Sequence, residues 1–436
     1  MDTLFSNVTC VTMNEAMDVL FSAFVGVEGG KIAYIGKTPP KEPPKTIIDG
    51  TGMVLLPGLI NCHIHLNDSL FSFYADGWKE EERQWLQSRR EAMDSRSAKA
   101  AALLTLARCM RYGVTSVSSL DWFTDEAAQA VAESGMKANL ARPARGYDPG
   151  DDGYDMENDM AFLELRRLHE TWHGHDGRIR VDAGFESPLS SMPEQWEALG
   201  GYAKTENLGV QLHLSRDAEE KEEILDRTGL TPAELMACHG ALWAPATVEG
   251  LFQPEADELR TLAKNKATYV VCSTARRNQG SEAPKPMDLA KAGINVALGS
   301  GSPASASCDL FRMMERICYE AKADGQADAM PAAAALMMAT VCGAKAQGRA
   351  SECGMIKVGY DADLILVDFT TTPFLPCHNV MTSLVHEATG SDVVLTMVKG
   401  KTLYQGGRYL TIDLDKVVQE LTQHAMNQVF TEEPTE

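Results

Sequence analysis

From Leu59 to about residue 355 the sequence alternates short apolar runs with longer segments of helical periodicity. This alternation is typical of βα units, in which helices connect parallel strands. About eight such units within about 300 residues fit a (β/α)8 barrel, or TIM barrel, of the α/β class. An open, doubly wound sheet is the alternative, but no GxGxxG motif follows the first strand to favour it. The strand candidates are Leu59–Cys62, Val114–Val117, Arg180–Ala183, Gly209–Leu212, Leu235–Cys238, Tyr269–Cys272 and Asn295–Leu298.

Both ends of the chain have a different pattern, with short β-branched runs separated by turn residues. The first 57 residues and the region from Gly354 onward read in this way, and Asp413–Phe430 shows helical spacing of its apolar residues. Two small β modules could therefore flank the barrel, or both ends could join in one module.

Charge and cysteine content argue against several classes of protein. The 436 residues include 61 acidic and 40 basic side chains, a formal net charge of −21, whereas nucleic acids and anionic membranes require a concentrated basic surface. The first residues do not resemble a secretion signal, and no apolar window is long enough to span a membrane. The ten cysteines are scattered without a CxxC pair, which predicts reduced thiols in a cytoplasmic protein.

The histidines carry the most informative chemical pattern. His63 and His65 lie two residues apart in Pro57–Leu66, so both rings project from the same face of a strand. At the C-terminal end of a barrel strand this face opens on the side where barrel enzymes work, and two neutral imidazoles there suit zinc or iron. His213 and His239 end two further apolar runs. We therefore predict a cluster of four imidazoles.

Several motifs resemble those of the amidohydrolase superfamily, in particular its branch of chlorohydrolases and of S-adenosylhomocysteine and methylthioadenosine deaminases. The resemblance extends over nearly the whole chain. It implies a (β/α)8 barrel of residues 58–355 and a small β-sandwich formed by residues 1–57 together with residues 356–436. The motifs are, in order, PGLINCHIHL, GVTSV, HLSRD, ACHG, AGINVALGS, GMIKVGYDADLILVDF and VKGKTLYQGGRYL.

The same resemblance implies a metal-dependent hydrolase that cleaves a carbon–nitrogen bond of a small, cyclic or heteroaromatic molecule. One divalent metal ion, zinc or alternatively iron, is expected on His63, His65 and His213, where it activates a water molecule. His239 falls on the histidine of the sixth strand, which polarises the substrate in this family. We expect a homodimer that binds a small-molecule substrate.

The sequence departs from this family at the positions that transfer protons. Gly301 in LGSGSP stands where the family has a metal-binding aspartate, and Arg216 in HLSRD replaces a proton-shuttling glutamate. Because a water on zinc needs a base to accept its proton, we consider other carboxylates. Glu186, which replaces a substrate-binding histidine, is our candidate for a relocated catalytic base. Asp121 ends a predicted strand and Asp309 is better explained as a helix N-cap.

Five further residues are candidates for substrate binding. Arg216 and Arg276 suit a carboxylate-bearing, anionic substrate and together predict a locally basic pocket. Trp78 lies in an aromatic segment after the HxH pair, and Ser300 and Ser302 flank the altered glycine. Arg216 could instead turn outward to an acidic neighbour: Asp217, Glu219 or Glu220.

A second hypothesis belongs to another functional class. The protein could be a catalytically impaired homologue that keeps the barrel as a binding or assembly module, because Gly301 and Arg216 replace two acid–base residues. The four retained histidines argue for the enzyme.

Overall fold

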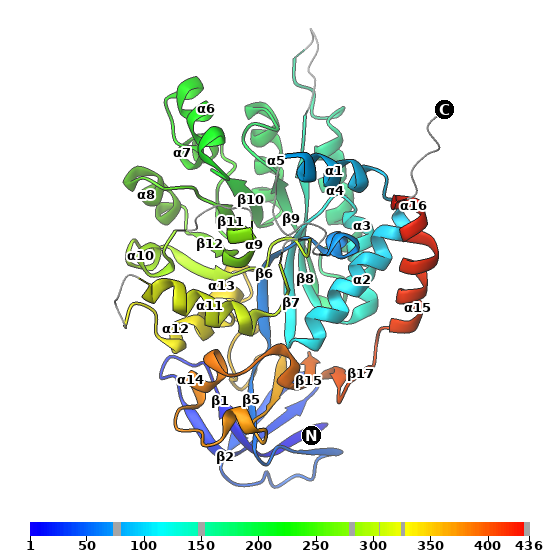
Figure 1. The fold of residues 1–436 in the computed structure, drawn as a ribbon, viewed down its shortest axis with the longest axis vertical. Coiled ribbons are helices and arrows are strands. Elements are labelled where there is room, and N and C mark those ends of the chain that lie inside the picture. The colour runs from blue at the N-terminus through cyan, green and yellow to red at the C-terminus, as the bar shows by residue number, and fades with distance from the viewer. Residues whose placement is uncertain (73–79, 147–152, 279–283, 305, 324–327, 431–436) are drawn as a thin grey trace.

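Eight parallel strands form a nearly closed barrel at the centre of the computed structural model (Figure 1). The structure describes residues 1–436 except 73–79, 147–152, 279–283, 305, 324–327 and 431–436. A bridge between Ile64 and Gly301 brings the last strand back to the first, which confirms the TIM barrel and excludes the doubly wound sheet. The strands are β6 (Leu59–Ile64), β7 (Val114–Leu120), β8 (Lys137–Ala144), β9 (Ile179–Phe185), β10 (Val210–Leu214), β11 (Ala246–Gly250), β12 (Ala267–Val271) and β13 (Asn295–Leu298).

Helices surround this barrel on its outer side (Figure 1). The strands are buried on nearly every residue, as expected for parallel strands covered by helices. None of the helices in the described part of the chain has the length and apolar character needed to cross a membrane. The helices between and after the strands are α2 (Ser95–Arg111), α3 (Thr124–Ser134), α4 (Met160–Trp172), α5 (Pro193–Thr205), α6 (Ala218–Thr228), α7 (Pro232–Cys238), α8 (Ala256–Lys264), α9 (Ser273–Asn278), α10 (Pro286–Lys291), α11 (Leu310–Lys322), α12 (Ala332–Met338) and α13 (Val341–Ala346).

A second, nine-stranded mixed sheet contains strands from both chain ends. Antiparallel pairing of β5 with β14, in which Leu55 lies opposite Leu366, joins the two ends. The domain limits 1–57 with 356–436, and 58–355, stay a prediction. The strands of this sheet are β1 (Thr3–Val11), β2 (Val19–Glu28), β3 (Lys31–Gly36), β4 (Thr46–Asp49), β5 (Met53–Pro57), β14 (Leu364–Asp368), β15 (Val393–Val398), β16 (Lys401–Gln405) and β17 (Arg408–Tyr409).

The strand predicted at Leu235–Cys238 is wrong, because this segment is the helix α7. A capping box forms between Thr231 and Glu234, and Pro232 occupies the first turn. Both features favour a helix start over a strand. The sixth barrel strand is instead β11, which begins eight residues after Cys238.

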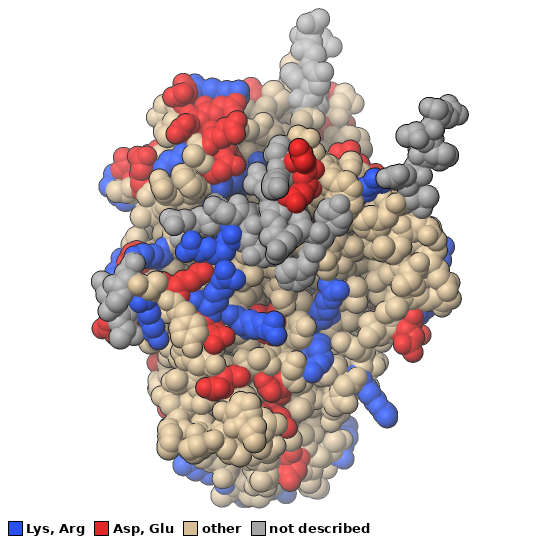
Figure 2. Space-filling model, in the orientation of Figure 1, with Lys and Arg blue, Asp and Glu red and all other residues tan. Residues whose placement is uncertain are grey.

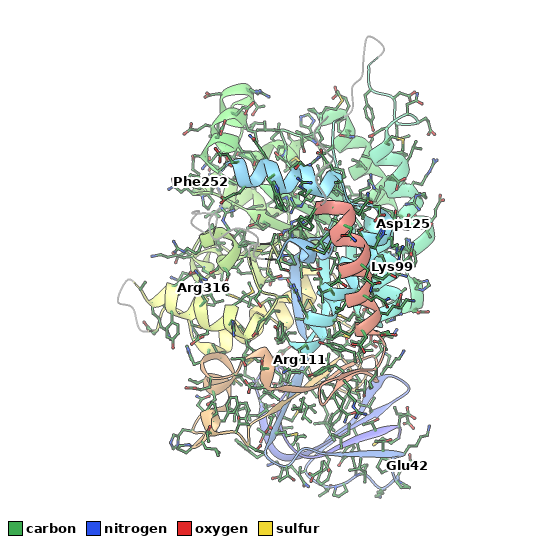
Figure 3. The ribbon with its side chains drawn as sticks, turned by 45° about the vertical axis from the view of Figure 1, so that its right-hand side comes forward. Glu42, Lys99, Arg111, Asp125, Phe252 and Arg316 are labelled. Carbon is green, nitrogen blue, oxygen red and sulfur yellow. The ribbon has the colours of Figure 1, made fainter. Side chains whose placement is uncertain are left out.

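The predicted helix at the chain end is present, and it packs against the barrel helix α2. It consists of α15 (Leu414–Glu420), the π-helical turn Leu421–Ala425 and α16 (Met426–Phe430). Val417, Leu421 and Ala425 are buried in the same apolar cluster as residues of α2, and the helix runs along α2 in Figure 3.

Buried ionic contacts fasten the mixed sheet to the barrel. The Lys137 side chain, at the start of β8, has no exposed area and donates to Asp361 at 2.7 Å and to Asp363 at 2.6 Å. Burial alone would lower the pKa of Lys137, but the two carboxylates raise it to about 12. Arg111 of α2, labelled in Figure 3, donates to the backbone oxygens of residue 390 and of the first residue of β15.

We expect Lys137→Met to lower the free energy of unfolding by about 3–5 kcal/mol, because it removes the ion-pair partner of buried Asp363 and the buried one of the two partners of Asp361. Lys31→Met is the matched control, since Lys31 also pairs with Asp361 but is 55% exposed; it should cost at most about 1 kcal/mol. Urea denaturation measures both values. Equal losses in the two variants would contradict the assignment of Lys137 as the anchor.

The same cluster predicts a pH dependence. Burial would raise the pKa of Asp361, but Lys137 and Lys31 lower it. Because the pKa of Asp361 is lower in the folded protein than the value of about 3.9 in the unfolded chain, the ionised carboxylate stabilises the folded state above that pH. This stabilisation is lost as the pH falls through the folded-state pKa. The difference between wild type and Lys137→Met should therefore be full at pH 7 and shrink toward pH 3.

Candidate active site

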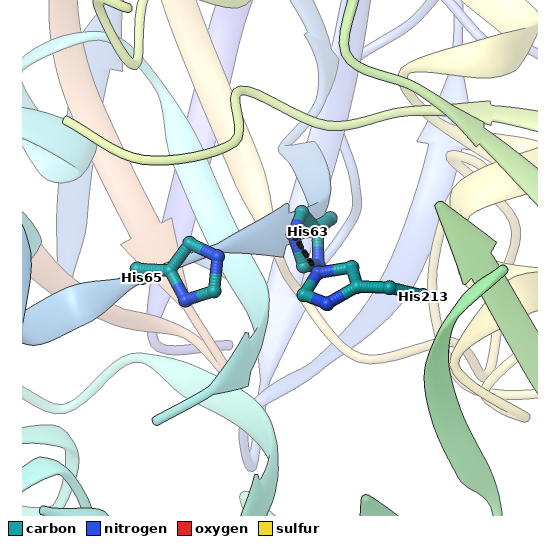
Figure 4. A group of neighbouring side chains, drawn as sticks. All are labelled: His63, His65 and His213. Atoms are coloured by element: carbon teal, nitrogen blue, oxygen red, sulfur yellow. Dashed lines mark hydrogen bonds between the residues drawn. The ribbon is translucent and has the colours of Figure 1, made fainter. Parts of the chain in front are cut away.

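Three histidine side chains meet at the C-terminal end of the barrel (Figure 4). His63 lies on β6, His65 directly follows that strand, and His213 lies on β10. The Nε2 atoms of His63 and His213 are 3.2 Å apart, and one ring nitrogen from each residue lies within 4.8 Å of the others. The HxH pair and His213 therefore converge as predicted.

Hydrogen bonds to backbone oxygens set the tautomer of two of these rings. Nδ1 of His65 lies 2.8 Å from the oxygen of Leu120, and Nδ1 of His213 lies 3.2 Å from the oxygen of Glu186. Because a carbonyl oxygen only accepts, Nδ1 of each ring donates, and the Nε2 lone pair is left for a ligand.

Burial also favours neutral imidazoles. It lowers the pKa of His63, and the neighbouring His65 and His213 lower it further. The pKa of His213 is lowered by burial as well, although Glu186 and Glu249 oppose this. Neutral imidazoles are the form that binds a divalent metal ion, and the donor set of His63, His65 and His213 fits the group that the sequence predicts.

The histidines lie in a cavity of about 1030 Å³, at the upper end of the size range of small-molecule sites. Barrel strand ends and the helix α1 (Glu80–Glu91) form its walls. Apolar and aromatic residues cover much of the lining: Leu86, Met93, Leu120, Trp122, Phe123 and Phe252.

Glu186 and Arg216 both line this cavity. Burial alone would raise the pKa of Glu186, but His213, His65 and Arg216 lie close enough to lower it below its ordinary value. Arg216 is 45% exposed; its Nε donates to Glu220 at 3.0 Å, and its Nη1 lies 3.8 Å from Glu186. Arg216 therefore lies at the cavity rim with Glu220 as partner, one of the outward contacts considered above.

The other predicted substrate-binding residues have different locations. Arg276 on α9 lines the cavity, is buried, and lies 3.5 Å from a carboxylate oxygen of Glu249. Ser302 also lines the cavity and donates to Asp68. Ser300 is buried against Asn61 instead and is not among the described lining residues. Trp78 lies outside the described residues.

The prediction that His239 joins the cluster is wrong. His239 caps the C-terminus of α7, its side chain is 30% exposed, and its Nδ1 pairs with Glu197 at 2.9 Å. It is not among the described residues that line the cavity. The physical reason is that LMAC continues the helix that Thr231 starts, so the histidine after it lies on the outside of the barrel.

Glu249 occupies the place in the sixth strand that we expected His239 to fill. It lies on β11 directly beside His213 in the parallel register, and it lines the cavity. Sequence reasoning missed it because the sixth strand was placed too early. The alternation in Ala246–Gly250, with a charged residue in a short β-branched run, was the signal available.

Of the two other carboxylates named from the sequence, Asp121 lies in the cavity and Asp309 at the start of a helix. Asp121 lines the cavity, accepts from the backbone N–H of Leu66 at 2.8 Å and lies 3.8 Å from Nδ1 of His65. Burial raises the pKa of Asp121. Asp309 caps α11 by accepting from Phe311 at 3.0 Å, as the N-cap interpretation predicts.

The prediction of a basic pocket is wrong for the described lining. Acidic residues outnumber basic ones there. Arg90 and Arg276 also each pair with a carboxylate from another segment of the chain, Asp68 and Glu249 respectively. On the outer surface, acidic side chains gather over α6 (Figure 2), whose sequence is AEEKEEILDRT. The charged lining residues are Asp68, Glu91, Asp121, Glu186, Asp217 and Glu249, and Arg90, Arg145, Arg216 and Arg276.

Comparison with known proteins identifies the class. Residues 54–403 match the model of the amidohydrolase family, and the chain belongs to that family. A 5-methylthioadenosine/S-adenosylhomocysteine deaminase of Thermoanaerobacter pseudethanolicus is 30% identical over 437 residues, covering 98% of this chain and 99% of the relative. A 5'-deoxyadenosine deaminase of Methanosarcina mazei is 31% identical over 438 residues, covering 96% of each chain.

Solved structures share the fold. An adenosine deaminase from Xanthomonas campestris with bound zinc has a TM-score of 0.89 at 23% identity and covers 98% of each chain. An atrazine chlorohydrolase from Arthrobacter aurescens complexed with zinc has a TM-score of 0.87 at 21% identity, covering 97% of this chain and 100% of that one.

Family membership and the deaminase relatives make the protein a hydrolase that acts on a carbon–nitrogen bond of a small molecule. The comparisons give no support to the hypothesis of an impaired homologue.

Metal binding should depend on His213 and not on His239. We expect His213→Ala to weaken Co²⁺ binding at least about 100-fold. Loss of a residue that only hydrogen-bonds a metal ligand lowers affinity about 10–100-fold, and loss of the ligand itself should cost more. His239→Ala is the control and should leave affinity unchanged. Calorimetric titration of both variants measures this, and equal affinities would contradict the three-histidine site.

The backbone at Gly301 leaves no room for a side chain. Its φ is +70°, and a Cβ there would lie 2.9 Å from the Cβ of Ala275. We expect Gly301→Ala to cost about 1–2 kcal/mol for the left-handed backbone and about 1–3 kcal/mol more for the overlap.

Gly293→Ala is the matched control for that substitution, since its φ is +84° and nothing lies near its Cβ position. It should show only the backbone cost. Chemical denaturation compares the two, and equal losses would show that Ala275 is not an obstacle.

Proposed function

We propose that the protein is a zinc-dependent aminohydrolase that replaces an amino group of a heteroaromatic ring by water-derived oxygen. The observation that carries this proposal is the convergence of His63, His65 and His213 inside the large cavity. Three imidazoles with one open position form a donor set of catalytic zinc sites. The solved zinc-containing proteins of the same fold support the choice of metal. Iron accepts the same ligands, so metal analysis belongs to the test.

Zinc held by these histidines would supply a Lewis acid that lowers the pKa of water. Glu186 is the proposed proton acceptor, because it follows β9 directly and its backbone oxygen already holds His213. In the reaction, the water oxygen forms a bond to the ring carbon and the carbon–nitrogen bond breaks. Glu186 takes a proton from water and gives it to the departing nitrogen, which leaves as ammonia.

The cavity walls support a flat, largely neutral substrate. Trp122, Phe123 and Phe252 offer aromatic surface, which stacks well on heteroaromatic rings. Arg276 and Glu249 provide a donor and an acceptor for a polar ring edge. Because carboxylates balance the arginines, a neutral ring is favoured over the anionic substrate considered above.

The named relatives are deaminases of adenosine derivatives, so aminopurines and their nucleosides are the first compounds to test. The cytoplasmic location and the homodimer stay predictions. All ten cysteines are free thiols, which supports a cytoplasmic location. Measurement of the mass in solution tests the homodimer.

We expect zinc-loaded protein to release ammonia from at least one compound in a panel of aminopurines, aminopyrimidines, aminopterins and aminotriazines. Glu186→Gln should lower kcat about 10²–10⁴-fold with zinc retained, the range for loss of a general base. Glu197→Gln, an exposed carboxylate outside the cavity, is the control and should keep full activity.

His63→Ala should abolish both zinc binding and turnover. Full zinc occupancy without ammonia release from any compound would instead favour a binding or assembly role.

A further inference from the structure

The helix α1 forms one wall of the cavity. Leu86, Gln87, Arg90 and Glu91 all line it, and α1 lies over the upper end of the barrel in Figure 1. We call this helix the roof helix.

The roof helix has little stability of its own. Its sequence, EEERQWLQSRRE, is mostly charged, and Trp85 and Leu86 are its large apolar residues. A helix of this length is marginal in water unless tertiary contacts hold it. The position of the cavity wall therefore depends on the contacts that α1 makes on its two sides.

The inner contact is an ion pair between half-buried Arg90 and buried Asp68. Nε of Arg90 donates to Asp68 at 2.9 Å, and Nη2 donates to the second carboxylate oxygen of the same residue. Asp68 is buried and also accepts from Ser302, beside the last barrel strand. A two-pronged arginine–carboxylate contact fixes orientation as well as distance.

The outer contact is made by the end of the chain. The ring of Phe430 stacks on Trp85 with centroids 5.8 Å apart and an angle of 29°. Nη1 of Arg89 donates to the backbone oxygen of Val429 at 3.1 Å. Val429 is buried in one apolar cluster with the wall residues Leu86 and Met93.

This end of the chain is held independently of the roof helix. His424 lies 2.8 Å from Asp94, which caps α2, and Glu420 lies 2.6 Å from Arg96. The C-terminal helix is thereby fastened along α2 and ends beside α1 (Figure 3). It can serve as a fixed support.

We propose that Val429 and Phe430 are positioning residues that hold the roof helix over the active-site cavity. The Arg90–Asp68 pair fixes the inner side of the helix and the aromatic contact fixes its outer side. This inference rests on the proposed function only in taking the cavity as the substrate site. It adds that residues remote from the histidines in sequence determine how tightly substrate is enclosed.

Hydrogen–deuterium exchange of residues 80–91 tests the proposal without a substrate. In Phe430→Ala we expect exchange in this segment to be about tenfold faster, because local opening becomes easier. Exchange in α5 (Pro193–Thr205) and the zinc content should not change. Phe430→Trp, which keeps the stacked ring, should restore slow exchange.

Met426→Ala is the matched control, since Met426 lies one turn earlier on the same helix and is 44% exposed; its exchange pattern should equal that of the wild type. Unchanged exchange of residues 80–91 in folded Phe430→Ala would overturn the proposal.

Steady-state kinetics on any compound that the wild type hydrolyses gives a second readout. Phe430→Ala should raise KM about tenfold and leave kcat within about twofold, because the reacting groups stay in place while enclosure weakens. A fall in kcat at constant KM would contradict positioning. Absence of turnover by the wild type would count against the proposed function alone, because the exchange experiment still decides the role of Phe430.

Discussion

The contact between His63 and His213 across the barrel is the interaction on which the site depends. The two residues lie on β6 and β10, the first and fifth strands, which have opposite positions in an eight-stranded barrel. Their Nε2 atoms come within 3.2 Å only because the barrel closes and both strands end at the same level. Backbone oxygens of the neighbouring strand ends then orient two of the rings. The fold itself thus supplies ligand geometry.

Charged side chains surround the histidine cluster in compensated pairs. Arg90 faces Asp68, Arg276 faces Glu249, and each pair joins two segments of the cavity wall. An unpaired charge at such depth would be strongly unfavourable. Gly301 and Arg216 replace two acid–base residues of the family, but other carboxylates line the same cavity. The proposed mechanism uses one of them, Glu186.

Local patterns were sufficient to predict the barrel, the HxH pair and His213, because strand periodicity places such residues on one face. The same reasoning failed for His239, where an apolar run belongs to a capped helix. It also missed Glu249, whose place follows from the correct sixth strand. The balance of charge in the cavity was not predictable, since Arg276 and Glu249 meet only through the fold.

Anomalous diffraction at the zinc edge, from crystals of zinc-loaded protein, would locate the metal ion itself. We expect one peak about 2.0–2.1 Å from the Nε2 atoms of His63, His65 and His213, the usual zinc–nitrogen distance. No peak at this cluster, or a peak held by other residues, would contradict this expectation.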